Sequence, residues 1–179
     1  MNLPAFITPN SLTIARLALI PFGAMALFIN GGGDYKWQII SWWIFFILGL
    51  SDIVDGRLAR SRQQVTELGK FLDPVADKAM VGTAMVCLSI LGRLPWWITI
   101  LIMSREIAIT IFRLSVVKRG VIPANQGGKI KAALQGFGTG FYVLPLDPSL
   151  YWFRDGFMYL TILVTIWTGL YYVKSAFRK

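Results

Sequence analysis

Four aspartates fall between positions 52 and 77 of a sequence that has only nine acidic residues in 179. They are Asp52, Asp55, Asp73 and Asp77. Carboxylates held together in a medium of low dielectric repel one another, so such a cluster needs a compensating positive charge. Because the chain has no histidine and its one cysteine lies elsewhere, the oxygen ligands favour Mg²⁺ or Mn²⁺ over zinc. Four carboxylates suit two ions, the arrangement used in phosphoryl-group displacement.

The composition indicates which elements must position these aspartates. Hydrophobic residues make up 55% of the chain and charged residues 15%, with a mean hydropathy of +0.59, whereas soluble domains carry about 25% charged residues. A bilayer core about 30 Å thick is crossed by about 20 apolar residues in a helix. We therefore expect an all-α integral membrane protein with a single domain, residues 1–179. The predicted spans cover about residues 12–30, 37–60, 68–92 (starting no later than 74), 95–117, 128–144 and 156–177, after a short interfacial segment at 3–10.

Basic residues are distributed unevenly between the two ends of these spans. Three of the eighteen fall inside spans, and only Lys36, Arg93 and Arg154 fall at one end. The other twelve share the opposite end: Arg57, Arg60, Arg62, Lys70, Arg113, Lys118, Arg119, Lys129, Lys131, Lys174, Arg178 and Lys179. The positive-inside rule then predicts that both termini are cytoplasmic. The net charge of +9 suits anionic headgroups or anionic substrates, and we expect no nucleic-acid partner.

The alternating direction of the spans predicts that the four aspartates lie at one depth, facing the cytoplasm. The second span ends with Asp52 and Asp55, and the third begins with Asp73 and Asp77. Spacings of three and four place each pair on one helix face, and the short connection makes the two helices antiparallel neighbours. The alternative is an ordinary helix-end charge cluster, with Asp52 paired to a nearby arginine. Four carboxylates on facing helices favour a functional site, because ionised groups are costly inside a bilayer.

The spacing of this segment resembles that of the CDP-alcohol phosphatidyltransferase family. The family pattern D-x-x-D-G-x-x-A-R-x8-G-x-x-x-D-x-x-x-D is met at Asp52, Asp55, Gly56, Ala59, Arg60, Gly69, Asp73 and Asp77. Its members transfer a phosphatidyl-type group from a CDP-linked lipid to an alcohol and release CMP, and they too have six spans. The segments PNSLTIARLALIP, GKFLDPVADK, SREIAITIFR and GKIKAALQ are similar to the bacterial phosphatidylglycerophosphate synthase branch, with Ala132 where that branch has Thr.

The resemblance implies roles for the motif residues. It implies that the four aspartates hold two divalent ions, Mg²⁺ or Mn²⁺, with Asp73 and Asp77 catalytic and Asp77 the general base toward the acceptor hydroxyl. Gly56 lets the nucleotide approach the helix backbone. The implied nucleotide contacts are Asn10, Thr13, Arg16, Gly56, Ala59, Arg60 and Gly69. The implied donor substrate is CDP-diacylglycerol.

The acceptor implied for this branch, sn-glycerol 3-phosphate, is a dianion and needs a basic pocket. Arg105 and Arg113 are eight residues apart in sequence, which puts them on one face of the fourth span. We expect Arg113, Lys129 and Lys131 to bind the acceptor phosphate, and Arg105, beside them, to pair with Glu106 or with an aspartate. The two lysines also fit an ordinary cytoplasmic flank.

Two alternatives of function stay open at this point. The same chemistry with another acceptor would use inositol phosphate, phosphatidylglycerol or serine. A small cation transporter would also place carboxylates inside spans, although transporters tend to bind substrate near the midplane. Family members are commonly homodimers, and the sequence Gly136-x-x-x-Gly140 is typical of helix interfaces.

Overall fold

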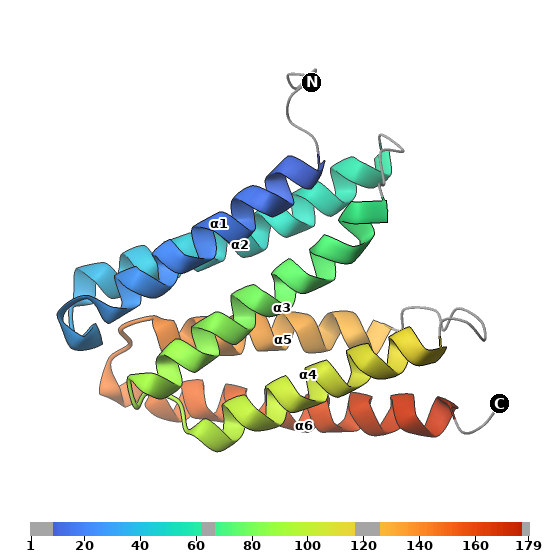
Figure 1. The fold of residues 1–179 in the computed structure, drawn as a ribbon. Coiled ribbons are helices and arrows are strands. Elements are labelled where there is room, and N and C mark those ends of the chain that lie inside the picture. Colours follow the sequence, from blue (N-terminus) through green and yellow to red (C-terminus); the bar gives the residue numbers. More distant parts are fainter. Residues whose placement is uncertain (1–8, 62–66, 117–125, 177–179) are drawn as a thin grey trace.

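A computed structural model describes residues 9–61, 67–116 and 126–176, with side chains described over 13–51, 75–112 and 127–172. This part of the chain contains six α-helices and two short 3-10 helices (Figure 1). They are α1 (Pro9–Phe28), η1 (Ile29–Gly32), α2 (Tyr35–Ser61), α3 (Glu67–Ile90), α4 (Trp96–Val116), α5 (Gln126–Val143), η3 (Pro148–Leu150) and α6 (Tyr151–Ala176). The predicted all-α class is confirmed. Of the expected interfacial segment, residues 3–8 lie outside the described residues, and Pro9 and Asn10 begin α1.

The turn between α1 and α2 follows from its residues. Asn30, Gly31 and Gly32 adopt positive φ values of 53°, 68° and 79°, a region that glycine and asparagine tolerate best. The Asp34 carboxylate then accepts hydrogen bonds from the backbone N–H groups of Lys36 (2.9 Å) and Trp37 (3.4 Å). A carboxylate in this position satisfies amide groups that the first turn of a helix leaves unpaired, so α2 begins here.

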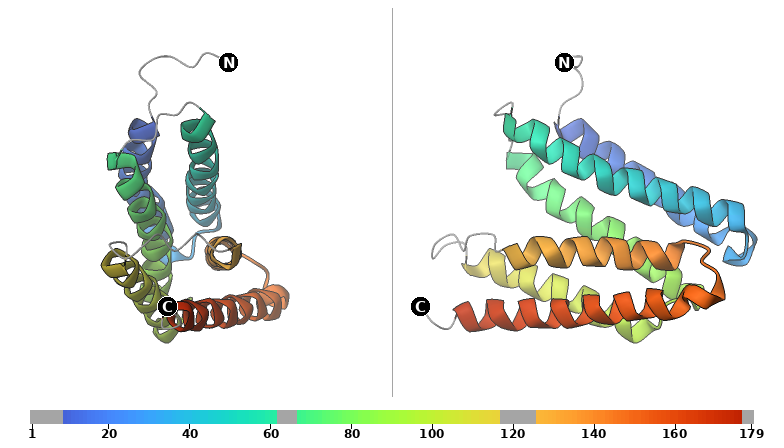
Figure 2. Two further views of the ribbon diagram at one scale, coloured as in Figure 1. Left: turned by 90° about the vertical axis from the view of Figure 1, so that its right-hand side faces the viewer. Right: turned by 180° about the vertical axis from the view of Figure 1, so that it is seen from behind.

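Helix α3 lies between two groups of helices. It packs against α1 and α2 on one side and against α4 and α5 on the other. Helices α1 and α2 form a slanted pair, and α4, α5 and α6 form the second group (Figures 1 and 2). Successive helices run in opposite directions, so α1, α3 and α5 begin at the end of the bundle where α2, α4 and α6 finish. This alternation is the one that the sequence predicts.

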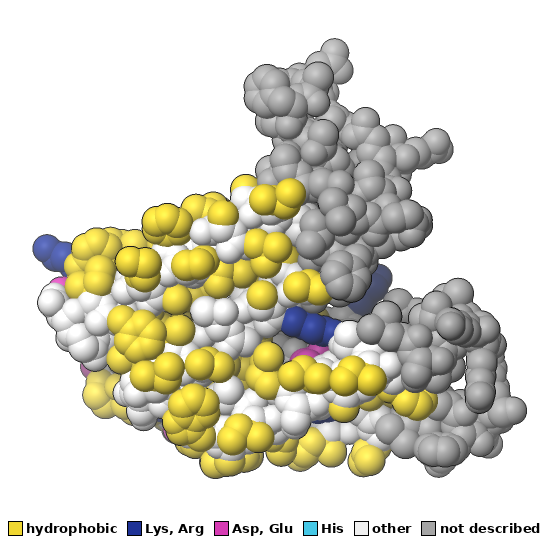
Figure 3. All heavy atoms as spheres, viewed as in Figure 1, with side chains coloured by type: hydrophobic (Ala, Val, Ile, Leu, Met, Phe, Trp, Pro, Cys, Tyr) yellow, Lys and Arg dark blue, Asp and Glu magenta, His cyan; other side chains and the backbone are white. Residues whose placement is uncertain are grey.

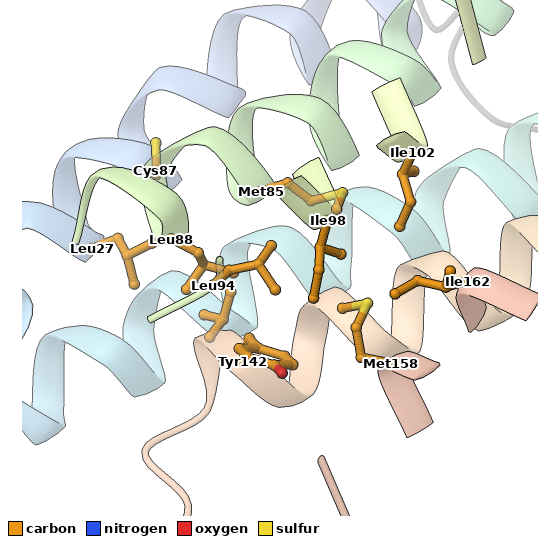
Figure 4. Close-up of a cluster of buried hydrophobic side chains, with 11 residues drawn as sticks. Leu27, Met85, Cys87, Leu88, Leu94, Ile98, Ile102, Tyr142, Met158 and Ile162 are labelled. Atoms are coloured by element: carbon orange, nitrogen blue, oxygen red, sulfur yellow. The ribbon is translucent and has the colours of Figure 1, made fainter. Parts of the chain in front are cut away.

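The apolar core draws side chains from both groups of helices. Leu27 of α1, Leu88 of α3, Ile98 of α4 and Met158 of α6 belong to one buried cluster (Figure 4). Cys87 is a free thiol in the same cluster. A Cβ at Gly82 of α3 would lie 2.7 Å from Cε of Met103 on α4, so the flexible end of that methionine would have to move. The core therefore fixes α3 against α4.

The outer surface of the bundle is largely apolar. Large hydrophobic side chains such as Trp152, Leu163 and Trp167 on α6 are exposed, and hydrophobic side chains are spread over the described part of the face in Figure 3. That face has a hollow beside the grey atoms where basic and acidic side chains lie next to each other. Among the described residues, one helical stretch, Thr13–Gly32, is long and apolar enough to cross a membrane by length and hydropathy alone.

Candidate active site

Two consecutive helices carry the four motif aspartates. Asp52 and Asp55 lie near the C-terminal end of α2, and Asp73 and Asp77 lie in the first half of α3. These two helix ends are at the same end of the bundle (Figure 1), and α2 packs against α3. The side chains of Asp52, Asp55 and Asp73 lie outside the described residues, so the structure places their helices and leaves their convergence a prediction.

Asp77 is the motif carboxylate whose surroundings the structure describes. Its side chain is partly buried on α3, and its charge attracts the ammonium group of Lys131 on α5. Lys131 itself is buried and donates a hydrogen bond of 2.5 Å from Nζ to Oε1 of Glu106 on α4. Helix α5, which carries a lysine that the sequence assigns to the acceptor phosphate, thus packs against α3, the helix of the last motif aspartate.

Glu106 is the centre of a buried polar cluster. Its Oε1 accepts hydrogen bonds from Nη1 of Arg105 (2.8 Å), Nζ of Lys131 and Nε2 of Gln135 (3.4 Å). Arg105 also donates from Nη2 to the hydroxyl of Thr168 on α6 at 2.9 Å. The expected pairing of Arg105 with Glu106 is confirmed. Both terminal guanidinium nitrogens of Arg105 therefore contact groups of the protein itself.

The cluster extends to the neighbouring helices. Gln135 donates a second hydrogen bond to Thr165 of α6 at 3.3 Å. Thr110 donates to the backbone carbonyl of Glu106 at 2.7 Å, and Lys78 of α3 donates to the Thr110 hydroxyl. Buried polar groups are stable only when they are hydrogen-bonded, and here α3, α4, α5 and α6 supply the partners. We call Glu106, Arg105, Lys131, Gln135, Thr165 and Thr168 the Glu106 cluster.

The two acceptor lysines differ in their surroundings. Lys129 is exposed near the start of α5, whereas Lys131 is buried two residues later. Positions two apart point to different sides of a helix, so Lys129 suits the flank interpretation and Lys131 the site. Their phosphate contacts and that of Arg105 stay predictions, and the side chain of Arg113 lies outside the described residues.

The implied nucleotide contacts come mainly from α1 and α2. Thr13 and Arg16 are both buried, three residues apart on the inner face of α1, toward the end of the bundle at which α2 finishes and α3 begins. An arginine buried in an apolar helix needs polar partners. The side chains of Asn10, Gly56, Ala59, Arg60 and Gly69 lie outside the described residues, and the nucleotide role of all seven stays a prediction.

Sequence reasoning did not identify Glu106 as a site residue or Gln135, Thr165 and Thr168 as its supports. A signal was present. Glu106 is the sole acidic residue between Asp77 and Asp147, and an acidic group within an apolar helix is costly unless paired. Gln135 follows Lys131 at i+4, and Thr168 follows Thr165 at i+3, so each pair shares one helix face.

The donor set matches a hard divalent cation. All four proposed metal ligands are carboxylates, and the chain has no histidine, so ligation of a soft metal is disfavoured. Within the residues whose side chains are described, no three acidic, cysteine or histidine groups lie together, and three of the four aspartates fall outside that part. The fit therefore depends on the oxygen chemistry of the four positions and on the two helices that carry them.

The family of this chain follows from its sequence similarity to known proteins. The profile of the CDP-alcohol phosphatidyltransferase family matches residues 6–167. A Mycobacterium tuberculosis protein named probable phosphatidylglycerophosphate synthase is 44% identical over 94% of this chain and 81% of its own length. Proteins named CDP-diacylglycerol–glycerol-3-phosphate 3-phosphatidyltransferase are 33% identical in Bacillus subtilis, over 93% of each chain, and 35% identical in Haemophilus influenzae, over 98% of this chain and 93% of the relative. This chain belongs to the CDP-alcohol phosphatidyltransferase family.

Proposed function

We propose that this protein is a phosphatidylglycerophosphate synthase. It transfers the phosphatidyl group of CDP-diacylglycerol to sn-glycerol 3-phosphate and releases CMP, a step of phospholipid biosynthesis. The structural observation that supports this choice is the buried ammonium of Lys131 on α5, a helix that packs against α3, which carries Asp77. A buried cation next to the helix of the last motif aspartate suits an acceptor that carries its own negative charge. The names of the bacterial relatives point to the same acceptor.

On the donor side, Asp52, Asp55, Asp73 and Asp77 would hold two Mg²⁺ or Mn²⁺ ions. When bound, such ions neutralise charge on a diphosphate and on the departing CMP. Thr13, Arg16 and Arg60 bind the nucleotide half of the donor, and Gly56 leaves room for it against the α2 backbone.

On the acceptor side, Lys131 binds the phosphate of glycerol 3-phosphate, with Arg113 as a further cationic contact. This orients the acceptor so that a hydroxyl faces Asp77. Asp77 accepts the proton from that hydroxyl as the oxygen attacks the phosphorus bound to CMP, and the bond to CMP breaks. Holding two reactants in register removes much of the entropic barrier of a bimolecular reaction.

The proposal places the protein in the inner (plasma) membrane of a bacterium, with six spans and both termini cytoplasmic. The six helices have 18 to 27 residues, or about 27 to 40 Å at 1.5 Å per residue, which suits a bilayer. The exposed apolar surface would contact lipid. A homodimer is part of the proposal. Gly136 is exposed on α5, and a Cβ there would meet no other group, which leaves this helix face open for close contact.

Purified protein reconstituted with CDP-diacylglycerol and Mg²⁺ tests the proposal. CMP release and phosphatidylglycerophosphate should appear with glycerol 3-phosphate and be lost with EDTA. Inositol phosphate, phosphatidylglycerol and serine form the comparison panel. Preference for one of these would contradict the acceptor assignment, and no CMP with any acceptor would contradict the enzymatic function.

A further inference from the structure

We propose that Glu106 is the positioning residue for acceptor binding. Its carboxylate holds the Lys131 ammonium in one position, so affinity for the anionic acceptor depends on a residue that does not contact the acceptor. The inference rests on the proposed function, in which Lys131 binds the acceptor phosphate.

Lys131 needs such a support because of its own flexibility. A lysine side chain has four rotatable bonds, and holding it in one rotamer costs conformational entropy. The 2.5 Å hydrogen bond to Glu106 supplies a fixed point, and both side chains are almost fully buried, at 10% and 11% exposure. An ammonium group has three donors, so one bond to Glu106 leaves capacity for a phosphate oxygen.

Glu106 is held from two other directions. Arg105 donates to the same carboxylate oxygen and is anchored to Thr168 on α6. Gly169 allows that contact, because a Cβ there would lie 3.3 Å from Nε of Arg105. Gln135 adds a longer hydrogen bond from α5. The carboxylate therefore stays in place when Lys131 binds a ligand.

Two carboxylates attract Lys131. Glu106 on α4 binds it directly, and Asp77 on α3 attracts it. Without the charge of Glu106, Asp77 would be the remaining acidic attraction that the structure assigns to Lys131. The ammonium would then shift toward the group that must accept the hydroxyl proton and away from the acceptor phosphate. We expect a weaker acceptor interaction and an unchanged nucleotide interaction.

Kinetics of Glu106→Gln, Lys131→Met and the double variant test the inference. Glutamine keeps the volume and one oxygen of Glu106, removes its charge and replaces the second oxygen by an NH₂ donor. Glu106→Gln should raise the KM for glycerol 3-phosphate about tenfold, with the KM for CDP-diacylglycerol changed less than about twofold. In the Lys131→Met background, which itself raises the acceptor KM, the same substitution should have no further effect. Glu106→Asp, which restores the charge, should recover part of the acceptor affinity.

Asp147→Asn is the matched control. Asp147 is exposed and accepts a hydrogen bond from Ser149 at the opposite end of the bundle, so removing its charge should leave both KM values unchanged. Equal rises in both KM values for Glu106→Gln, or an equal effect of the substitution with and without Lys131, would overturn the positioning role. A wild-type protein that does not use glycerol 3-phosphate would overturn the proposed function and this inference with it.

Discussion

Two ion pairs between adjacent residues have the same length and very different surroundings. Arg105 and Glu106 approach to 2.8 Å, and so do Arg154 and Asp155. The side chain of Glu106 is 11% exposed, whereas that of Asp155 is 42% exposed. The first pair lies within the Glu106 cluster. The second lies at the start of α6, where the Arg154 guanidinium sits 4.3 Å from the ring centre of Tyr142 and 4.1 Å from that of Tyr151.

The difference shows that the environment of an ion pair, and not its length, indicates what it does. Aromatic faces and the Tyr142 hydroxyl, which donates to Asp155 at 2.8 Å, complete the outer pair and tie α5 to α6. The inner pair adds a second cation, Lys131, on a helix that packs against that of a motif aspartate. A pair completed by aromatic groups stabilises the fold, whereas a buried pair with an additional cation can also bind an anion.

The largest expected effect is on enzymatic activity. It should distinguish a substitution at the motif aspartates from one in the Arg154–Asp155 pair. Asp77→Asn should lower the rate of CMP release by about 10²-fold or more, because it removes a metal ligand and the proton acceptor. Asp155→Asn is the same chemical change in the outer pair and should leave the rate unchanged. A stopped assay for CMP measures both. Near-wild-type turnover by Asp77→Asn would contradict its assignment.

The next largest effect is on the free energy of unfolding, which should differ between substitutions in the Arg105–Glu106 pair and in the Arg154–Asp155 pair. Glu106→Ala leaves Arg105 and Lys131 buried without their shared carboxylate, which should lower the free energy of unfolding by about 3–5 kcal/mol. Asp155→Ala affects a pair whose carboxylate is 42% exposed and should cost less, about 1 kcal/mol. Unfolding titrations in mixed micelles compare the two variants. Equal losses would show that the solvation of the pair does not matter.

A smaller effect should come from two glycines of α6. Gly169→Ala brings a Cβ to 3.3 Å from Nε of Arg105, so the guanidinium must move by a few tenths of an ångström. This should raise the acceptor KM about two- to threefold if the Glu106 cluster positions Lys131. Gly156→Ala on the same helix meets nothing within 4 Å and should leave KM unchanged. A larger rise in the acceptor KM for Gly156→Ala than for Gly169→Ala would show that Arg105 does not influence acceptor binding.

The smallest effect concerns acid stability. The hydrogen bond from the Asn30 side chain, together with those from Trp37 and Lys36, holds the pKa of Asp34 below its ordinary value. A lowered pKa in the folded state means that the charged carboxylate contributes stability above the ordinary pKa and loses it as the pH falls through the folded value. Asp34→Asn should therefore lower Tm slightly at neutral pH and have less effect in strong acid. Thermal melts across the acidic range measure this difference.

Much of the fold follows from the sequence, because apolar runs and glycine breaks mark the helices directly. The predicted start at 95 and end at 117 agree closely with α4, Trp96–Val116. The exception is α6, which begins at Tyr151 and not at Gly156. Asp147 accepts a hydrogen bond from Ser149 and starts η3, which leads directly into α6. Hydropathy alone places the start of α6 too late, because the polar residues Arg154 and Asp155 interrupt the apolar run.

The motif aspartates could also be found from the sequence, because their spacing within each of two consecutive helices can be read directly from it. The Glu106 cluster could not. It depends on which faces of α4, α5 and α6 meet, and a contact such as Arg105 to Thr168 joins residues 63 positions apart. Spacing along one helix does not determine how three helices rotate against one another. The buried and exposed positions of Lys131 and Lys129 likewise required the packed bundle.

The same long separation has a consequence for how the protein is made. Thr168 lies on the last helix, so Arg105 has no access to that hydroxyl until nearly the whole chain has been synthesised. Contacts between distant segments form late because chain entropy opposes them. During biogenesis the nascent α4 therefore carries Arg105 through a stage in which its Thr168 partner is missing. A chain truncated before Thr168 should lack this contact and lose activity.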